Sequence, residues 1–294
     1  MCIRLLTAAD LPAAMALKES AGWNQTEADW RMLLEQEPEG CFAMESEGRV
    51  VASATAYCYG RDLAWIGMVL TLPQARRRGF GGRAFCAAVD FCQDRGVRCL
   101  KLDATDIGRP LYERAQFLPE YQVERWGKQV TGDRLQAAGA SQASAHLPFA
   151  TCHLPPLDEG RLRCLAALDA KAFGVSRAAL LEALLRNSDW SACVERDGAP
   201  VAYVVSRPGT NARYFGPCVA ASLEDARALW EALFARFPNQ PVFVDVPAPN
   251  TAARGLIESY GFQVRRTLLR MYRGPNDRPG APSLVYGLAG FEYG

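Results

Sequence analysis

Residues Arg76–Gly81, with the sequence Arg-Arg-Arg-Gly-Phe-Gly, are the stretch that decides the fold of this chain. They follow an apolar run at 65–72, which predicts a buried strand, and they precede residues 82–92, whose apolar side chains recur at helical spacing. Glycines let a ligand approach the backbone closely, and the free N–H groups of a first helical turn attract anions. Arginines add charge-assisted hydrogen bonds. A strand, a basic glycine loop and a helix in this order predict a diphosphate site.

Two familiar phosphate-binding loops do not fit this stretch. A Walker loop ends in Gly-Lys-Ser or Gly-Lys-Thr, and a dinucleotide-binding loop has three spaced glycines with an acidic residue about 20 positions later. The pattern Arg/Gln-x-x-Gly-x-Gly/Ala after a strand instead resembles the acetyl-CoA loop of the GNAT superfamily of N-acetyltransferases, with Arg76, Gly79 and Gly81 at its defining positions. A solvated basic turn is the alternative interpretation of so short a motif.

A second motif supports this resemblance. Residues 98–104 predict another strand, and residues 105–117 look like the second GNAT signature, a short helix that carries Leu-Tyr-Glu and ends near Gly-Phe. Gln116 stands where a glycine usually precedes Phe117, a difference that affects the end of the helix and not the chemistry. The two motifs occur in the expected order, separated by the length that one helix and one strand require.

The composition argues against several classes of binding partner. The 294 residues carry a net charge of +1 without a long basic run, so we expect no nucleic-acid partner. No secretion signal and no apolar stretch near the ~20 residues that span a bilayer are evident, so we expect a soluble, cytoplasmic protein without membrane contact. The ten cysteines and two histidines show no metal-binding spacing, and no metal is expected. Monomer and homodimer both remain open.

Three pairs of short matches, in the same order in each half, suggest that the chain contains one fold twice. The pairs are 47–52 with 197–202, 65–67 with 214–216, and 105–117 with 250–262. This layout resembles the bacterial GNAT subgroup that has a second, GNAT-like domain at the C-terminus. The implied fold class is α/β (α+β): tandem GNAT folds, each with a mixed, mostly antiparallel central sheet flanked by helices.

The second copy lacks the phosphate loop. In its place Ser222 begins a capped helix with Asp225 in the capping-box position, which puts carboxylates where a diphosphate would lie. Ile257 stands at the position that Tyr112 has in the first copy. The predicted domains are a catalytic GNAT domain at 1–130, a linker at 131–148 and a degenerate GNAT-like domain at 149–294.

The GNAT resemblance also implies how acetyl-CoA binds. The strand before the loop would pair with the pantetheine arm, with a backbone N–H polarising the thioester oxygen, and the loop would hold the diphosphate. The residues at these positions are Val69, Leu70, Thr71, Arg76, Arg77, Arg78, Gly79, Phe80, Gly81 and Gly82, with Thr105 and Gly108 beside them.

Two side chains are candidates for catalysis. Tyr112 matches the superfamily tyrosine near the thioester sulfur, and the resemblance implies that it protonates the leaving thiolate; a packed aromatic residue is the alternative. Some members carry a glutamate base on the motif strand, where this chain has Trp65. Asp103 is the best remaining carboxylate, as a base acting directly or through water, as a substrate anchor, or as a helix cap.

The loop between the first two expected helices covers the acceptor site in this superfamily. Trp23, Asn24 and Gln25 are therefore candidate substrate-binding residues, by stacking and by amide hydrogen bonds. An equally good interpretation has Asn24 or Thr26 capping the next helix, with Trp23 as a hydrophobic staple.

Two functions from different classes follow. The first is an N-acetyltransferase that transfers acetyl from acetyl-CoA to a primary amine, on a small molecule or an exposed protein amine, by direct attack in a ternary complex. The second is a CoA- or acetyl-CoA-binding sensor or scaffold without turnover. An acidic, narrow pocket would favour small cationic amines, and a broad groove would favour peptides. The second half would wall off one side of the acceptor channel, with Tyr203, Tyr214 and Asn250 as candidates.

Overall fold

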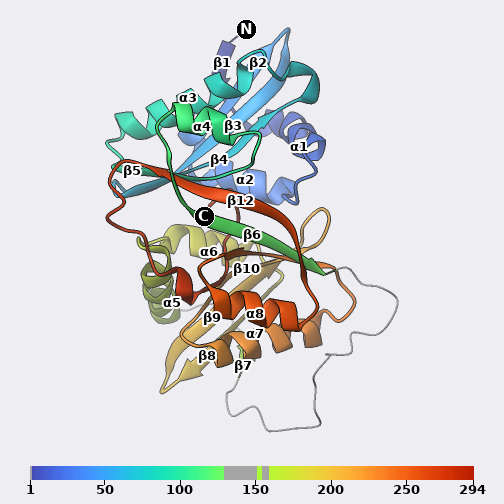
Figure 1. The fold of residues 1–294 in the computed structure, drawn as a ribbon, viewed down its shortest axis with the longest axis vertical. Helices are drawn as coiled ribbons and strands as arrows, with labels where there is room; N and C mark the ends of the chain where they lie inside the picture. Colours follow the sequence, from blue (N-terminus) through green and yellow to red (C-terminus); the bar gives the residue numbers. More distant parts are fainter. Residues whose placement is uncertain (1, 129–150, 154–158) are drawn as a thin grey trace.

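The structure is a computed structural model that describes residues 2–128, 151–153 and 159–294, so the linker predicted at 131–148 lies outside the described residues. Its two halves lie one above the other along the long axis (Figure 1). The elements of the first half are β1 (Cys2–Leu5), α1 (Leu11–Ser20), α2 (Glu27–Gln36), β2 (Cys41–Ser46), β3 (Arg49–Tyr59), β4 (Leu63–Thr71), α3 (Phe80–Asp94), β5 (Cys99–Ala104), α4 (Arg109–Arg114) and β6 (Leu118–Lys128). Short 3-10 helices lie at Ala8–Asp10, Pro38–Gly40 and Pro73–Ala75.

The second half repeats this order of elements. Its elements are β7 (Thr151–His153), α5 (Glu159–Phe173), α6 (Ala178–Arg186), β8 (Trp190–Arg196), β9 (Ala199–Arg207), β10 (Arg213–Ala220), α7 (Leu223–Arg236), β11 (Val242–Pro247), α8 (Thr251–Ser259), β12 (Gln263–Arg273) and β13 (Val285–Gly287), with a 3-10 helix at Pro282–Leu284. None of the helices in the described part of the chain is long and apolar enough to cross a membrane.

One sheet runs through both halves. Its strand order is β1-β2-β3-β4-β5-β12-β6-β11-β10-β9-β8-β7, and the pairings are antiparallel except β4 with β5 and β10 with β11. Strand β12 of the second half therefore lies between β5 and β6, and β6 of the first half lies between β12 and β11, as the crossing strands in Figure 1 show. The mixed, mostly antiparallel sheet expected for each copy is confirmed, but the two copies share it by exchanging their long last strands.

Backbone conformation confirms that the copies match. The turns that join β2 to β3 and β8 to β9 both contain an acidic residue with positive φ, Glu47 at 54° and Asp197 at 52°. The helices α4 and α8 both end before a left-handed residue, Gln116 with φ 65° and Gly261 with φ 79°. Gln116 thus adopts the conformation for which glycine is usual at this place.

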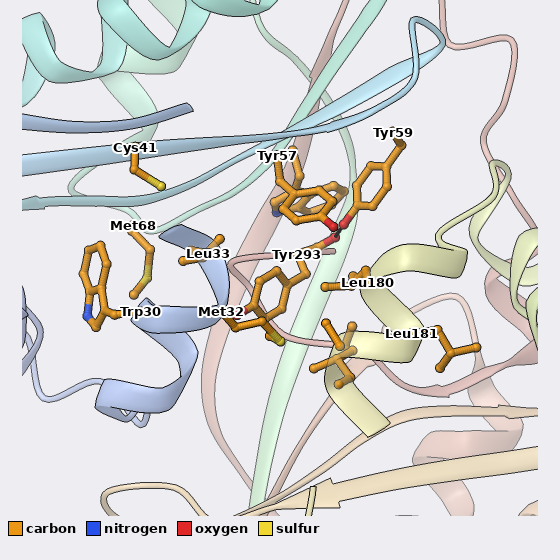
Figure 2. Packing of buried hydrophobic residues seen from close by; sticks show 14 of the residues in the cluster. Trp30, Met32, Leu33, Cys41, Tyr57, Tyr59, Met68, Leu180, Leu181 and Tyr293 are labelled. Atoms are coloured by element: carbon orange, nitrogen blue, oxygen red, sulfur yellow. Dashed lines mark hydrogen bonds between the residues drawn. The ribbon is translucent and has the colours of Figure 1, made fainter. Parts of the chain in front are cut away.

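A hydrophobic cluster joins the halves. Tyr57 and Tyr59 of β3 pack close to Tyr293 near the C-terminus, and Leu180 and Leu181 of α6 belong to the same cluster (Figure 2). The Tyr59 hydroxyl donates a hydrogen bond of 2.6 Å to the Tyr293 carbonyl. Burial of aromatic side chains of this size is worth several kcal/mol in total, at roughly 25 cal/mol per Å² of apolar surface. The halves are therefore packed together through apolar side chains as well as through the shared sheet.

Candidate acyl-transfer site

The basic glycine loop lies exposed between β4 and α3, as the sequence predicts. Arg76, Arg77, Arg78 and Gly79 are exposed, and Gly79 with φ 82° is the N-cap of α3 without a side-chain hydrogen bond. Arg77 has φ 61°, a left-handed conformation that glycine adopts more easily. Because the first N–H groups of a helix have no partner within it, this end of α3 offers backbone donors beside three cations.

Gly81 lets α3 start close to the end of β4. A Cβ at this position would lie 2.5 Å from Oγ1 of Thr71, well inside van der Waals contact. At Gly82 the nearest atom to such a Cβ is Cδ1 of Leu111, at 3.6 Å. Of the two glycines, only Gly81 is required for the close approach of helix and strand. Phe80 is buried beneath this turn.

Strands β4 and β5 are paired at their start and diverge toward their C-terminal ends. They pair in parallel only where Leu63–Trp65 meet Cys99–Lys101. Farther along, β4 is irregular: Met68 has φ 49°, and its carbonyl accepts a 2.8 Å hydrogen bond from the Ser53 hydroxyl. The register with β5 ends at Trp65, and Val69 of β4 lines a pocket in the gap between the two strands.

This gap, which we name the β4–β5 pocket, has a volume of about 440 Å³ with the open space at its mouth included. Both halves and the loop after α1 line it. The lining residues are Trp23, Ile66, Gly67, Met68, Val69, Leu102, Asp103, Thr105, Tyr112, Arg266, Leu268 and Phe291. The second half therefore supplies one wall, as expected, but with Arg266, Leu268 and Phe291 instead of the residues nominated from the sequence. Of those, the Tyr203 hydroxyl donates to Asp169 and Asn250 caps α8.

Tyr112 lies in the β4–β5 pocket and packs on Phe85, with ring centroids 5.1 Å apart. Its hydroxyl forms no hydrogen bond with any of the described residues. Burial raises the pKa of Tyr112 well above its usual value, so the phenol stays protonated at neutral pH. Gly108 allows the ring to approach, because a Cβ there would lie 2.9 Å from it, and the Thr105 hydroxyl accepts a 3.2 Å hydrogen bond from the Gly108 N–H.

Asp103 also lines the pocket, but both oxygens of its carboxylate accept hydrogen bonds from a buried arginine. Nε and Nη2 of Arg270 in β12 donate to its two oxygens at 2.9 Å each. Arg270 also donates to the Tyr121 hydroxyl and lies 4.5 Å from the Trp65 ring centroid. Burial raises the pKa of Asp103, and Arg270 opposes this by stabilising the charged form. The pair is a bidentate ion pair that joins the halves.

Of the three loop residues expected to bind the acceptor, Trp23 alone lines the β4–β5 pocket. The Asn24 amide donates to the Ala212 carbonyl and accepts from the N–H groups of Asn211 and Ala212. The Gln25 amide donates to Glu292 at 2.6 Å. Both amides thus bind the second half. Thr26 caps α2, one of the alternatives that the sequence left open.

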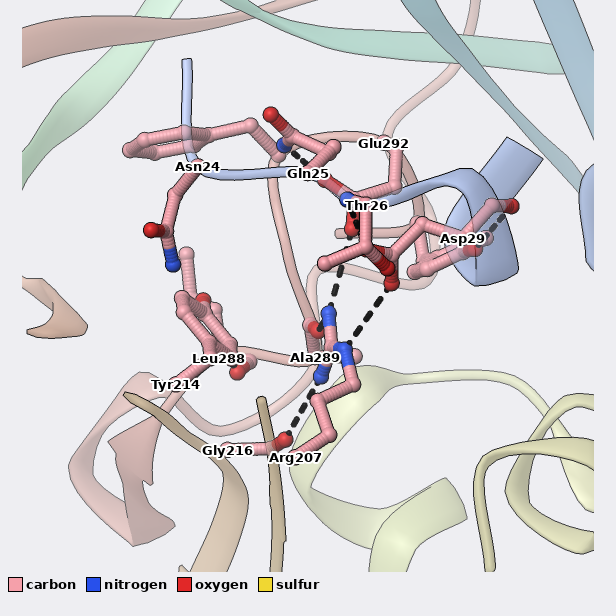
Figure 3. A network of polar contacts seen from close by, with 12 residues as sticks. Asn24, Gln25, Thr26, Asp29, Arg207, Tyr214, Gly216, Leu288, Ala289 and Glu292 are labelled. Atoms are coloured by element: carbon pink, nitrogen blue, oxygen red, sulfur yellow. Dashed lines mark hydrogen bonds and ion pairs between the residues drawn. The ribbon is translucent and has the colours of Figure 1, made fainter. Parts of the chain in front are cut away.

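A buried polar network holds this loop against the second half (Figure 3). Arg207 of β9 donates to Asp29 of α2 at 3.0 Å, to Glu292 at 3.1 Å, and to the carbonyls of Gly216 and Ala289. Burial raises the pKa of Glu292 to about 7, and Arg207 opposes the rise. The loop between α1 and α2 is therefore fixed by contacts with the second half.

In the second half the corresponding gap is filled by the chain itself. Strands β10 and β11 also pair in parallel only at their start, and β13 then pairs with β10. The Leu288 N–H donates to the Asp245 carbonyl of β11, so the tail closes the opening from both sides. Ser222 caps α7 and binds Asp225, as predicted. The segment that fills this gap continues to Phe291, which lines the β4–β5 pocket.

A basic glycine loop at a helix N-terminus, leading to a pocket between two diverging parallel strands, is the arrangement that the GNAT resemblance implies. Comparison with family models agrees: residues 10–117 match the family described as "Acetyltransferase (GNAT) family", and residues 165–287 match that described as "Acetyltransferase (GNAT) domain". The chain belongs to the GNAT family, with one such domain in each half, and acyl transfer is its class of activity.

Individual relatives resemble the whole chain. "Holothin acyltransferase" of Pseudoalteromonas sp. (strain SANK 73390) is 25% identical over 283 residues, which cover 96% of this chain and 89% of the relative. The crystal structure of a candidate acetyltransferase from Pyrococcus horikoshii superposes with a TM-score of 0.81 at 22% identity, covering 100% of this chain and 95% of that one. A tandem GNAT protein from the clavulanic acid biosynthesis pathway gives 0.67 at 15% identity, covering 94% and 99%.

Proposed function

We propose that this protein is an N-acetyltransferase that transfers the acetyl group of acetyl-CoA to a primary amine on a small molecule. The observation that carries the proposal is the position of Tyr112, which lines the pocket between β4 and β5, while the glycine loop lies at the start of α3, just after β4. One extended CoA molecule would then reach from the glycine loop, which would bind its diphosphate, to Tyr112, which would act as the proton donor.

The residues of the loop fit a diphosphate. Gly81 leaves no side chain between the end of β4 and the first turn of α3, and Arg76, Arg77 and Arg78 are exposed and able to turn toward an anion. The free N–H groups of α3 would bind the phosphate oxygens, and the arginines would add charge-assisted bonds. Leu70 and Thr71 would support this turn from β4, and the open backbone at Val69 would pair with the pantetheine arm.

The bound thioester supplies an activated acyl group, so the protein needs to orient and to stabilise charge. An N–H group of β4 at the pocket would stabilise negative charge on the carbonyl oxygen. Tyr112 would donate a hydrogen bond to the sulfur as it leaves. Because the pKa of Tyr112 is raised, this hydroxyl acts as a donor to the thiolate and not as a base.

Among the described residues that line the pocket, no carboxylate is free to act as a base for the acceptor amine, because Arg270 binds both oxygens of Asp103. The amine would therefore enter neutral or lose its proton to water. This feature also favours the second candidate, a CoA-binding sensor without turnover. Asp103 would act by holding Arg270, and through it β12, in place.

The lining of the β4–β5 pocket favours a small acceptor. It is mostly apolar and aromatic with few polar side chains, as is usual for small-molecule sites. The relative that covers 96% of this chain is named for acyl transfer to holothin, which also fits a small-molecule acceptor in place of a protein amine.

A screen of the full-length protein with acetyl-CoA and a panel of primary amines tests the proposal, with released CoA measured by a thiol reagent. We expect turnover with at least one small amine, and the product to carry an amide. Tight acetyl-CoA binding without acetylated product from any panel member would favour the sensor. No binding of acetyl-CoA at all would exclude both functions.

A further inference from the structure

Arg266, from the second half, lines the β4–β5 pocket together with Trp23 and Phe291. Arg266 lies in β12 where its pairing with β6 is interrupted, between Val264 and Arg266. Its guanidinium carbon is 5.8 Å from the ring centroid of Trp23 and 5.3 Å from that of Phe291. The cation is therefore within cation–π distance of two aromatic rings that line the same pocket.

Unlike Arg270 and Arg125, Arg266 has no carboxylate partner among the described residues. Arg270, four residues along the strand, holds Asp103, and Arg125, its cross-strand neighbour, holds Asp245 at 2.6 and 2.7 Å. Within the described part of the chain, Nε of Arg266 is buried without a hydrogen-bond partner. Burial and the nearby Arg125 lower the pKa of Arg266 to about 10, so it remains charged at neutral pH.

A partly buried cation without a partner is costly, and the usual remedy is an opposite charge with good hydrogen-bond geometry. The other charged residue of the pocket, Asp103, is already neutralised. The pocket thus presents one uncompensated positive charge, which matches one negative charge on a ligand. It also disfavours polycationic acceptors, because like charges repel in a site of low dielectric constant.

We infer that Arg266 binds a carboxylate of the acceptor, so that the acceptor is an amino-acid-like molecule that carries both a primary amine and a carboxylate. The inference rests on the proposed N-acetyltransferase function and names its substrate class. The planar guanidinium offers two parallel N–H donors that match a carboxylate. Trp23 and Phe291 flank it and would contact the apolar body of the same molecule.

The test uses binding as well as turnover. N-acetylglycine, N-acetylleucine and N-acetylphenylalanine, each compared with its amide, are titrated into the full-length protein saturated with CoA, and affinity is measured by calorimetry. We expect at least one acid to bind about 10- to 100-fold more tightly than its amide, as for a charge-assisted pair. Arg266→Gln should remove this difference, and Arg266→Lys should retain part of it. Arg265→Gln, at the exposed neighbouring position, is the matched control and should bind as the wild type.

Turnover is then measured with the free amino acids and with their amides. An acid preference that is lost in Arg266→Gln and kept in Arg265→Gln supports the inference. Equal affinity for every acid and its amide in the wild type, or equal losses from both substitutions, would overturn it even if amines are acetylated. Acid binding that depends on Arg266, without turnover of any amine, would overturn the proposed enzyme function and leave the carboxylate site standing.

Discussion

The substitution Gly81→Ala tests which of two features contributes more to acetyl-CoA binding. One is the backbone N–H groups at the start of α3, held close to β4, and the other is the charge of the loop arginines. Gly81→Ala places a Cβ 2.5 Å from Oγ1 of Thr71, so the first turn of α3 must move away from β4 or Thr71 must rotate. Overpacking of this kind costs ~1–3 kcal/mol of folding stability, partly offset by the ~1 kcal/mol by which alanine favours a helix over glycine. Gly82→Ala is the matched control, because its Cβ would meet Leu111 at an ordinary 3.6 Å.

Displacing the turn removes backbone donors from the ligand. Each hydrogen bond to a charged group contributes about 1.5–3 kcal/mol, so losing one weakens affinity by about 10- to 100-fold. Gly81→Glu adds a negative charge near the phosphates, at a cost of about 4 kcal/mol for charges 4 Å apart at an effective dielectric constant of 20, or about 1,000-fold in affinity. Gly82→Ala should change affinity less than threefold.

Calorimetric titration of the full-length variants with acetyl-CoA measures these affinities, and urea unfolding measures their stability. The double substitution Gly81→Ala with Thr71→Ala removes the clash and should recover most of the affinity lost in Gly81→Ala. If Gly81→Ala and Gly82→Ala bind acetyl-CoA equally well, the close approach of α3 to β4 has no part in binding. In that case the loop acts through its arginines alone.

Three further substitutions test separate groups. Tyr112→Phe should lower kcat at least tenfold with an unchanged Kd for acetyl-CoA, and an unchanged kcat would make this tyrosine structural. Arg77→Gly should weaken acetyl-CoA binding less than tenfold and leave stability equal or higher, because φ is 61°; a drop in the urea midpoint would contradict this account. Glu292 has a folded pKa of about 7, above its unfolded value, so its contribution to stability is full at acid pH and is lost as pH rises through 7. Between about pH 4.5 and 7, the unfolding free energy of the wild type should fall more steeply with pH than that of Glu292→Gln, by up to ~1.4 kcal/mol per pH unit. Identical pH slopes for the two proteins would refute this.

The strand, glycine turn and helix around Gly79 could be predicted from the sequence because their signals are local. Glycine tolerates the left-handed φ of 82° at Gly79 and the close contact at Gly81, and both lie within one strand–turn–helix unit. The same holds for the capped helix that replaces the loop in the second half, where Ser222 binds Asp225 three residues later. Interactions between residues this close together leave a pattern that spacing alone reveals.

The acceptor side could not be predicted in the same way, because it depends on strand pairing between distant segments. Arg270 reaches Asp103 across 167 positions of the chain, and this pairing requires β12 to enter the sheet of the other copy. Two successive copies of a fold give the same alternation of side chains whether or not they exchange strands. The contacts of Asn24 could not be predicted for the same reason, since its partner Ala212 is 188 residues away.

The exchange explains why a copy without a phosphate loop remains necessary to the first one. Without β12, strands β5 and β6 would lose their shared neighbour and leave unpaired backbone edges in the middle of the sheet. The segment that closes the gap between β10 and β11 continues to Phe291, which lines the β4–β5 pocket. The Trp65 indole donates a hydrogen bond of 2.9 Å to the Phe291 carbonyl. A ligand bound between β10 and β11 would displace this segment. Ligand binding between β10 and β11 would therefore remove Phe291 from the β4–β5 pocket, and in this chain Phe291 lines that pocket.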